Sequence, residues 1–498
     1  MWKLSKKSIA ENLFLLLQAQ LLGLIFFVIL YPKLPLRKIF NTFVAIRLDD
    51  IYLLGIYLVF ILCFLLGTIK INKKFLKLFM AFWAVVIVSF LWGRFVGGTI
   101  PEHMTLVGAL NAFRRVQYMG VFFVAFSCIR SRENFWLYFS ALMTSLLFVN
   151  IYGFGQRFLS WPSFSTMNPE FAKGMMLILT PEARLNSTFA GHYDLAAYLV
   201  FLIPLIWGAY YTLKNRTNHL MMILLYTLSL AILFFTASRT SFIAYLVSAP
   251  LFFVFIRKWK ALTFVMIISV VLMAVSPALL TRFLSTFQIR QILVDPRTGK
   301  TMIVQNNTIK ELPAGDTFVR TGGSMDTNET RAFKDRLRES YMEQSLPLAS
   351  IEAELSGLQT QQVVAADISM TTRFQVEWPR AFNAFLKNPI LGTGPISITE
   401  STDNDYLRWL GETGALGFLL LLSIVLALNW QFFLKFKSAS AKEDRYLYLG
   451  VIIGSWGLLV NALYIDVFEA SKVAYTFWFT MGIFFALTRL ENDAKSKS

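Results

Sequence analysis

Apolar segments as long as a membrane-spanning helix recur along the whole chain, and this repetition restricts the fold more than any other feature. A helix needs about 20 apolar residues to cross a bilayer. About twelve such stretches are present, at 13–31, 51–69, 76–93, 112–129, 134–153, 195–212, 219–236, 239–256, 261–280, 412–434, 446–465 and 472–490. The sequence therefore predicts an all-α polytopic membrane protein with about 12 transmembrane helices. The fourth stretch is the weakest, because Arg114 and Arg115 stand at its start.

Composition and charge agree with a membrane protein. Of the 498 residues 56% are hydrophobic and 15% are charged, whereas a soluble domain carries about 25% charged residues. The net charge of +17 comes from Lys and Arg placed between the apolar segments, where they favour cytoplasmic loops and anionic lipid headgroups. Nucleic-acid binding is therefore not expected.

The distribution of Lys and Arg also predicts the orientation, because cytoplasmic loops carry their excess. With the amino terminus inside, the basic short loops fall on one side, at 70–77, 130–132, 214–216, 257–260, 435–445 and 489–497. Both termini are then cytoplasmic. The segments 154–194 and 281–411 lie on the outer face.

The segment 281–411 is much longer than a connection needs to be, and such loops are commonly functional. Two β-like runs around an Asp-Pro…Gly turn predict a hairpin within 289–312. A charged helix is expected at 328–345, and an amphipathic helix at 372–389 with Phe374, Trp378, Phe382 and Phe385 on one face. We therefore expect transmembrane helices 1–9 in 1–280, a small α+β extracytoplasmic cap in 281–411, and helices 10–12 with a cytoplasmic tail in 412–498.

Three polar clusters stand where the bilayer meets the outer face. Arg184, His192 and Asp194 precede or begin one helix, and Arg239 lies between two apolar segments joined by a very short turn. Arg239 is either a snorkelling side chain or part of an anion site. His192 is either a base or a structural histidine.

The third cluster, in "STDNDYLRWLGETGALG" (401–417), directly precedes an apolar helix. Its polar members are Asp403, Asn404, Asp405, Tyr406, Arg408 and Glu412. Helix capping accounts for one or two of the acids and leaves the others without a role. A functional site is the alternative.

The three clusters share the outer face in the predicted topology, so they are expected to meet in one cavity. Guanidinium groups suit phosphate oxygens, and a carboxylate can act as general base toward a hydroxyl. This set fits a reaction in which a lipid-borne pyrophosphate leaves and a hydroxyl attacks. A transporter, a scaffold, and a metal-dependent transferase using Asp403 and Asp405 are the alternatives from other classes.

The pieces "RLNSTFAGHYDLAAYL", "TASRTSFIAYL", "RFQVEWPRAFNAFLKNPILGTGP" and "DNDYLRWLGETGALG", in this order, resemble the O-antigen ligase and polymerase family of bacterial membrane glycosyltransferases over about 184–490. The resemblance implies inverting transfer of glycan from undecaprenyl pyrophosphate, without a metal or other cofactor. It also implies that Arg184 and Arg239 contact the pyrophosphate.

One position departs from the family pattern. Ligases of this family carry a histidine before Asn or Ser, a nine-residue gap and "GxxG"; here Asn404, the gap, Gly414 and Gly417 are kept, and Asp403 replaces the histidine. We therefore expect Asp403 as general base, with Asn404 and His192 as the other catalytic residues. The expected supporting residues are Asp194, Arg373, Asp405, Tyr406 and Glu412.

The departure favours a polymerase of repeat units for O-antigen, capsule or exopolysaccharide over a ligase that acts on lipid A core or another acceptor. The expected partners are an undecaprenyl-pyrophosphate-linked glycan donor, a glycan or lipid acceptor and membrane lipids, together with a chain-length regulator and a flippase. The expected location is the bacterial cytoplasmic membrane, with the site on its periplasmic or outer face.

Overall fold

The computed structural model describes residues 6–495 with gaps at 33, 39–44, 70, 165–175, 181–182, 276, 285–286, 295–300, 306–307, 312–317, most of 321–358, 367–369, 371, 399–401 and 439–443. The chain forms two compact units. One combines Met1–Leu280 with Arg380–Ser498, and the other is Thr281–Pro379.

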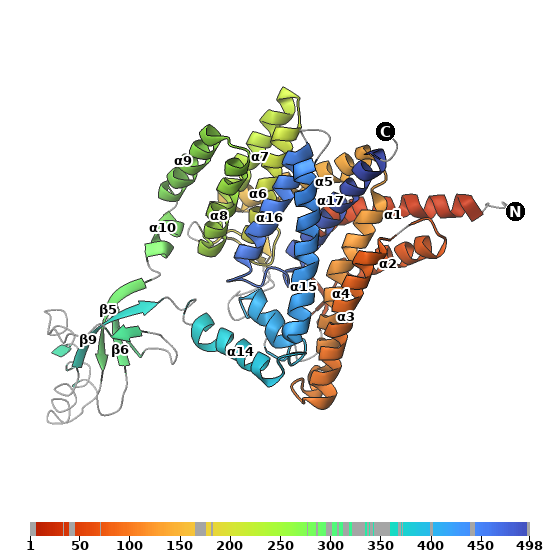
Figure 1. Cartoon of the computed structure of the whole chain (residues 1–498). Coiled ribbons are helices and arrows are strands. Elements are labelled where there is room, and N and C mark those ends of the chain that lie inside the picture. The colour runs from red at the N-terminus through yellow and green to blue at the C-terminus, as the bar shows by residue number, and fades with distance from the viewer. Residues whose placement is uncertain are drawn as a thin grey trace. The chain divides into compact units, whose positions relative to one another are not determined.

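The first unit consists mainly of helices (Figure 1). They are α1 (Lys6–Leu30), α2 (Leu48–Leu65), α3 (Lys73–Leu91), α4 (Thr105–Cys128), α5 (Arg132–Phe158), α6 (His192–Thr212), α7 (Arg216–Phe235), α8 (Arg239–Phe255), α9 (Trp259–Val275), α15 (Asp405–Ser438), α16 (Asp444–Asn461) and α17 (Ser471–Lys495). Short elements complete it: the paired strands β1 (Pro35–Lys38) and β2 (Ala45–Arg47), the pair β3 (Ser163–Phe164) and β4 (Met176–Leu177), and the helical turns η1 (Trp92–Val96) and η2 (Glu102–Met104). Two helices, α10 (Pro277–Leu284) and α14 (Trp378–Lys387), lie at the boundaries with the second unit.

A helix covers each of the apolar stretches predicted to span the membrane. Within the described residues, eight of these helices are long and apolar enough to cross a bilayer. Two more, α8 and α9, are apolar but shorter. The helices α4 and α16 do not reach the same hydropathy, in α4 partly because Arg114 and Arg115 lie inside it. The protein is a polytopic membrane protein, and the number of spans beyond these eight stays a prediction.

Side-chain caps mark where several helices begin. A Ser or Asn before the first helical residue accepts a hydrogen bond from a backbone N–H that the helix itself leaves unpaired. The capping residues are Asn72 of α3, Ser131 of α5, Asn215 of α7 and Ser238 of α8. These caps explain why the helices start at residues slightly outside the apolar windows.

Burial separates central helices from peripheral ones. In both α6 and α17, 89% of the apolar window is buried inside the protein, compared with 22% in α2 and 28% in α3. Glycines let α6 and α16 approach closely, since the Cα of Gly208 lies 3.4 Å from the place of a Cβ on Gly450. Small residues at helix contacts serve the same purpose in other membrane proteins. The exposed apolar side chains of α2 and α3 are suited to face lipid.

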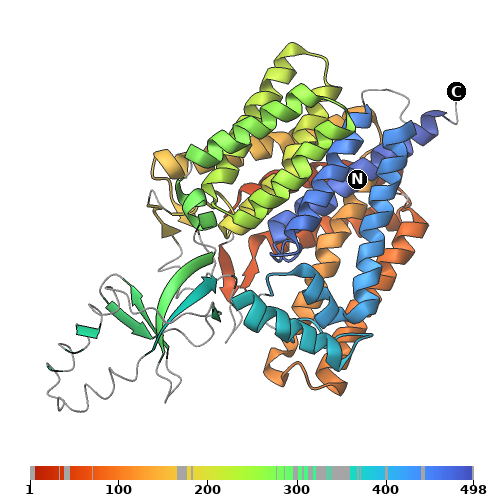
Figure 2. The same cartoon turned by 60° about the vertical axis from the view of Figure 1, so that its left-hand side comes forward.

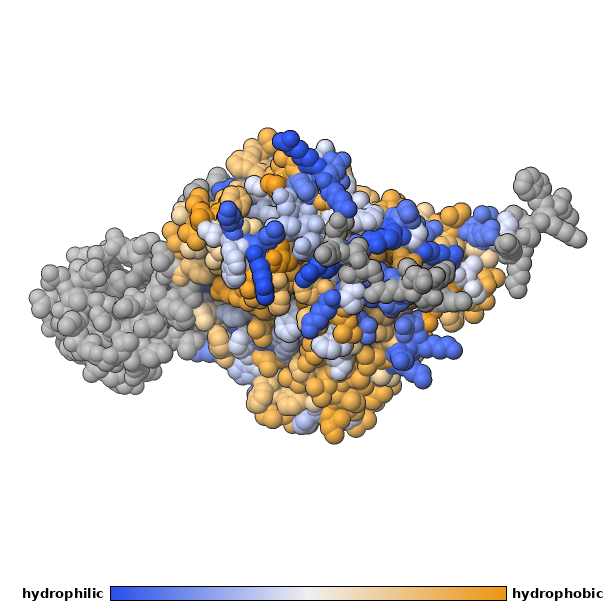
Figure 3. Space-filling model, turned by 45° about the horizontal axis from the view of Figure 1, so that its top comes forward, coloured by the Kyte–Doolittle hydropathy of each residue, from blue (hydrophilic) through white to orange (hydrophobic). Residues whose placement is uncertain are grey.

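The basic short loops lie together at one end of the first unit. The connections α4–α5, α6–α7 and α8–α9 and the last turn of α15 carry their Lys and Arg residues there. Figure 3 looks partly onto this end and shows hydrophilic side chains over it, with apolar surface along the sides. The connections α5–α6 and α7–α8 and the start of α15 lie at the opposite end (Figure 1).

The second unit contains a five-stranded antiparallel sheet with the order β7-β6-β5-β9-β8. Its strands are β5 (Phe287–Val294), β6 (Thr301–Gln305), β7 (Thr308–Glu311), β8 (Phe318–Arg320) and β9 (Gln359–Ala366). Val294 pairs with Thr301, as the predicted hairpin requires. The charged helix predicted at 328–345 lies mostly outside the described residues. The amphipathic helix predicted at 372–389 is present as η3 (Arg373–Glu377) followed by α14. Residues 380–411 group with the helices rather than with the sheet.

Candidate active site at one end of the helical unit

Hydrogen bonds bring the three predicted polar clusters to the same end of the first unit. The backbone N–H of Leu185 donates to the carbonyl of Phe235, at 3.1 Å, so the segment after Arg184 lies against the end of α7. Ser241 of α8 hydrogen-bonds to Asn461 at the end of α16. The next residue, Ala462, accepts the N–H of Asp405 at 3.0 Å. The segments around Arg184, Arg239 and Asp403 are therefore linked through the ends of α7 and α16.

Arg184 and His192 lie in direct contact. Nη1 of Arg184 is 2.9 Å from Nε2 of His192, the first residue of α6. A guanidinium only donates, so Nε2 accepts and the imidazole carries its proton on Nδ1. Asp194 lies in the first turn of α6 and is half-buried. The Arg184 guanidinium is thus hydrogen-bonded to Nε2 of His192.

Arg239 is the first residue of α8 and is half-buried. The turn before it is short, because Ala237 takes a left-handed conformation with φ +48° and Ser238 then caps the helix. Ser187 in the α5–α6 connection and Asp403 before α15 are left-handed as well, both with φ +49°. Non-glycine residues rarely adopt this region, and such residues gather at functional sites. Each of the three segments contains one of them.

Lys472 of α17 holds the Arg184–His192 segment in place. Its side chain is buried, and Nζ donates to the carbonyls of Ile29 at 2.7 Å and Thr188 at 2.6 Å. It also lies 5.1 Å from the ring centre of Phe189. One ammonium group therefore ties α1, the α5–α6 connection and α17 together.

The carboxylate of Asp466 fixes the backbone before α15. It accepts three successive N–H groups, from Thr402 at 2.8 Å, Asp403 at 3.1 Å and Asn404 at 3.0 Å. The side chain of Asn404 caps α15 by accepting from Leu407 N and donates to the carbonyl of Leu463. Asn404 therefore caps α15, and its expected catalytic role stays a prediction. The side chain of Asp403 is half-buried.

Asp405 and Tyr406 are also held by neighbouring backbone. Asp405 is fully buried, and its carboxylate accepts the N–H of Phe468 at 3.1 Å. The Tyr406 hydroxyl donates to the carbonyl of Leu459 at 2.8 Å. Both residues attach the start of α15 to the end of α16 and the α16–α17 connection. Their expected supporting role in catalysis stays a prediction.

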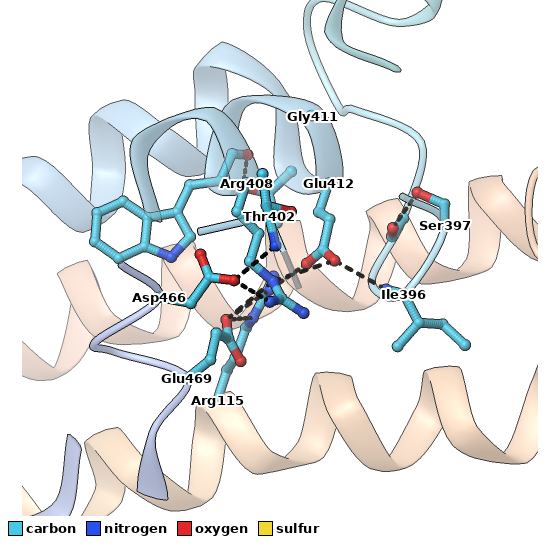
Figure 4. A network of polar contacts seen from close by, with 12 residues as sticks. Arg115, Ile396, Ser397, Thr402, Arg408, Gly411, Glu412, Asp466 and Glu469 are labelled. Carbon is cyan, nitrogen blue, oxygen red and sulfur yellow. Dashed lines mark hydrogen bonds and ion pairs between the residues drawn. The ribbon is translucent and has the colours of Figure 1, made fainter. Parts of the chain in front are cut away.

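Glu412 belongs to a buried ionic network that crosses three parts of the chain (Figure 4). Arg115 of α4 binds Glu412 directly and lies 2.9 Å from Glu469. Arg408 lies 2.8 Å from Asp466 and 3.5 Å from Glu412. Two guanidinium groups are thus shared among three carboxylates at a buried site, where loss of one partner leaves an uncompensated charge.

The network lowers the pKa of Glu469. Burial alone raises the pKa of a carboxyl group, but the guanidinium groups of Arg115 and Arg408 outweigh burial here, and the pKa lies below its ordinary value. Glu469 is therefore charged at neutral pH. Its ion pairs with Arg115 and Arg408 connect α4 to the start of α15.

Sequence reasoning missed Arg115, Asp466, Glu469 and Lys472 as members of this region. Arg115 could be recognised from the sequence, because an arginine inside an apolar segment is costly unless it is paired or faces water. The stretch "YIDVFEASK" (464–472) places three charged residues between two apolar helices. Only the fold reveals which cluster they serve.

Arg373 is a different case. It lies in η3 of the second unit and is buried. Its supporting role stays a prediction.

The helix α15 is broken where the predicted "GxxG" begins. Gly414 has φ 64° and ψ −173°, a conformation open essentially to glycine alone. The segment 389–394 runs beside 411–416 and satisfies the backbone groups that the break releases. The bonds are Thr393 N to Gly411 O (2.8 Å), Gly394 N to Glu412 O (3.0 Å), Ala415 N to Pro389 O (2.8 Å) and Leu416 N to Ile390 O (3.2 Å).

Replacing Gly414 with alanine is expected to abolish stable folding. The new Cβ would overlap the carbonyl oxygen of Ile390, and the backbone conformation itself is strained by about 1–3 kcal/mol for any other residue. Gly98→Ala is the matched control, because Gly98 has φ +60° with open space around it. Thermal unfolding of both purified variants in detergent measures the difference. Equal melting temperatures would show that the break tolerates a side chain.

Comparison with protein families bears on these residues. A family model described as O-antigen ligase matches residues 224–422. This stretch is an O-antigen ligase domain. Over these residues the chain is similar to the membrane glycosyltransferases of the O-antigen ligase and polymerase group. No curated protein matches the chain.

The O-antigen ligase domain contains part of the site described above. Arg239, Asp403 and Glu412 lie within the matched residues, whereas Arg184 and His192 precede them and Asp466 follows them. The match is narrower than the resemblance that the sequence suggested, which extended over about 184–490. The residues outside the domain reach it through the hydrogen bonds and ion pairs given above.

Proposed function

We propose that this protein polymerises oligosaccharide repeat units carried on undecaprenyl pyrophosphate. The observation that carries the proposal is the meeting of the Arg184, Arg239 and Asp403 segments at one end of the helical unit, within and beside an O-antigen ligase domain. The basic loops gather at the opposite end, which supports a site on the outer face of the cytoplasmic membrane.

The reaction proposed is an inverting transfer. A sugar hydroxyl of the acceptor attacks C1 of the donor sugar, a bond forms between that oxygen and C1, and the bond from C1 to the pyrophosphate oxygen breaks. Asp403 takes the proton of the hydroxyl, and the pyrophosphate leaves on its lipid. Arg184 and Arg239 bind the pyrophosphate and stabilise the charge that develops on it.

The sequence position of Asp403 supports it as the base, and the polar side chains near it hold the start of α15 in place. Asn404, Asp405 and Tyr406 are occupied by backbone partners, and Glu412 is paired with Arg115. Nε2 of His192 is occupied by Arg184. Asp403 stands at the position where the family's ligases carry their histidine. His192 is the second candidate, after a shift of Arg184 toward the pyrophosphate.

A ligase is the second candidate function, because the matching family model is described as O-antigen ligase. Purified protein in liposomes with a lipid-linked repeat unit distinguishes the two. A ladder of products supports the polymerase. One shifted band that requires a different acceptor supports the ligase. Absence of any product with either acceptor would overturn both and favour transport or a structural role.

Lysine at the two arginine positions is expected to lower turnover by roughly tenfold or more, because lysine keeps the charge and loses the planar fork that binds two phosphate oxygens. The variants are Arg184→Lys and Arg239→Lys, with unchanged expression. Arg157→Lys is the matched control: Arg157 lies at the same end of the unit and packs on the Phe235 ring at 5.4 Å. Full turnover in both test variants would return the arginines to a snorkelling role.

A further inference from the structure

The segment Arg380–Lys387 of α14 divides its surface into three faces. One face, formed by Ala381 and Ala384, is buried against Ile398 and Leu407. A helix has 3.6 residues per turn, so the next face around it carries Phe382 and Leu386, which are 51% and 56% exposed. The remaining face is polar and exposed, with Arg380, Asn383 and Lys387. This order, protein then apolar then polar, is typical of a helix lying at a membrane surface.

The apolar face continues into the part of α15 that is suited to face lipid. Ile390, just after α14, is 67% exposed, and its carbonyl accepts the N–H of Leu416. Leu416 and Leu419 of α15 are themselves 43% and 56% exposed. Because α15 is long and apolar enough to cross a bilayer, these leucines mark where its apolar surface begins. Ile390, which follows α14, is hydrogen-bonded to the first of these leucines.

Close contacts fix α14 against α15. Gly411 lies so near the carbonyl of Ala381 that a Cβ on it would approach that oxygen to 2.8 Å. Leu407, which packs on the buried face of α14, donates its N–H to Asn404. Arg380–Lys387 runs obliquely to α15 in both views (Figures 1 and 2). The height of α14 is thus tied to the height of the segment around Asp403.

We propose that α14 is an interfacial helix whose apolar face, Phe382 and Leu386 with the adjoining Ile390, is seated among the lipid chains of the outer leaflet. Arg380 and Lys387 then face the headgroups, where positive side chains are favoured near anionic lipid. Through Ile398 and Leu407, this seat holds the Asp403 segment at the level of the bilayer surface. The pyrophosphate of a lipid-borne donor lies at that level.

Fluorescent labelling directly tests whether the apolar face of α14 contacts lipid chains. Single cysteines at Phe382, Leu386 and Ile390, and matched ones at Asn383 and Lys387, are introduced with Cys63 and Cys128 replaced by alanine, and are labelled with an environment-sensitive dye in liposomes. Quenching by lipids with nitroxides on their chains is expected at the first three positions, and quenching by aqueous iodide at the last two. Iodide quenching at all five would overturn the proposal. Protection of the first three from both quenchers would overturn it in favour of a covering protein surface.

A second measurement tests whether the lipid contact of α14 affects turnover at the Asp403 segment. This test rests on the proposed function. The variant Phe382→Gln with Leu386→Gln is expected to lose turnover at least severalfold with a full-length donor in liposomes, and to keep it with a short-chain donor in detergent. Asn383→Ala is the control and should keep both activities. Equal loss in detergent would show damage to the site itself and overturn the link. No turnover by the unmodified protein would contradict the proposed function and leave the quenching result valid.

Discussion

Asparagine at position 403 is expected to slow turnover at least about a hundredfold, the lower range of what general base assistance contributes. A carboxylate accepts the proton of the attacking hydroxyl, and an amide does not. The substitution is nearly isosteric, and the backbone N–H of residue 403 still reaches Asp466. Asp403→Asn should therefore insert normally and bind the lipid-linked donor. Single-turnover assays with purified protein, beside a donor-binding measurement, check both parts.

Asp405→Asn is the control for this variant. The amide oxygen of the new residue can still accept from Phe468 N, so its effect on turnover should be milder. A chelator in the same assay separates a metal-dependent reaction, which would stop, from a carboxylate base, which would continue. An Asp403→Asn enzyme that still makes a full ladder would contradict the assignment and favour His192.

Asp466→Asn extends the test to the residue that holds the Asp403 backbone. Asparagine accepts fewer of the three N–H groups and no longer pairs as a charge with Arg408. If Asp466 acts through Asp403, the double variant should turn over about as slowly as Asp403→Asn alone, because contacting residues that work together do not add. If the double variant loses turnover by the product of the two single losses, the result would indicate a general loss of structure instead.

Glutamine at position 412 is expected to destabilise the protein by about 3–5 kcal/mol, the usual cost of removing one partner from a buried ion pair. Its amide oxygen can still accept from Ile396 N, but its NH2 group then faces the guanidinium of Arg115, so two donors meet. Arg115 and Arg408 are left with fewer negative partners. The free energy of unfolding, measured by titration with SDS in mixed micelles, checks this result for Glu412→Gln.

Glu102→Gln is the matched control for the buried pair. Glu102 also pairs with an arginine, Arg94, at 3.5 Å, but its side chain is 91% exposed. An exposed pair contributes about 0–1 kcal/mol, so this variant should unfold like the unmodified protein. Similar behaviour of the two variants would mean that the network at Glu412 is open to water.

The helices could be predicted from the sequence because lipid imposes a minimum length on apolar segments. The hairpin joining β5 and β6 was equally accessible, since a turn motif separates two β-like runs. The three polar clusters could be identified because charged side chains at the ends of apolar helices are costly unless they are paired or face water.

The partners of these clusters could not be predicted in the same way. Arg115 precedes Glu412 by 297 residues, and Asp466 follows Asn404 by 62. Pairing over such separations depends on which helices become neighbours, and no local pattern encodes that. The break at Gly414 is similar, because the segment 389–394 that fills it is identified only by its position beside the helix. The cap that Asn404 forms follows from its position just before a helix, whereas the ion pair of Glu412 with Arg115 does not follow from any local pattern.

The position of Asp466, Glu469 and Lys472 along the chain has a consequence for biosynthesis. All three stand in or just before α17, so they are synthesised after α1 to α16. The segments that carry Arg184, Arg239 and Asp403 are synthesised earlier, before these three side chains are present to bind them. Asp466 then binds the backbone before α15, and Lys472 binds the carbonyl of Thr188. The contacts that hold these segments in place therefore form only after α17 has been synthesised.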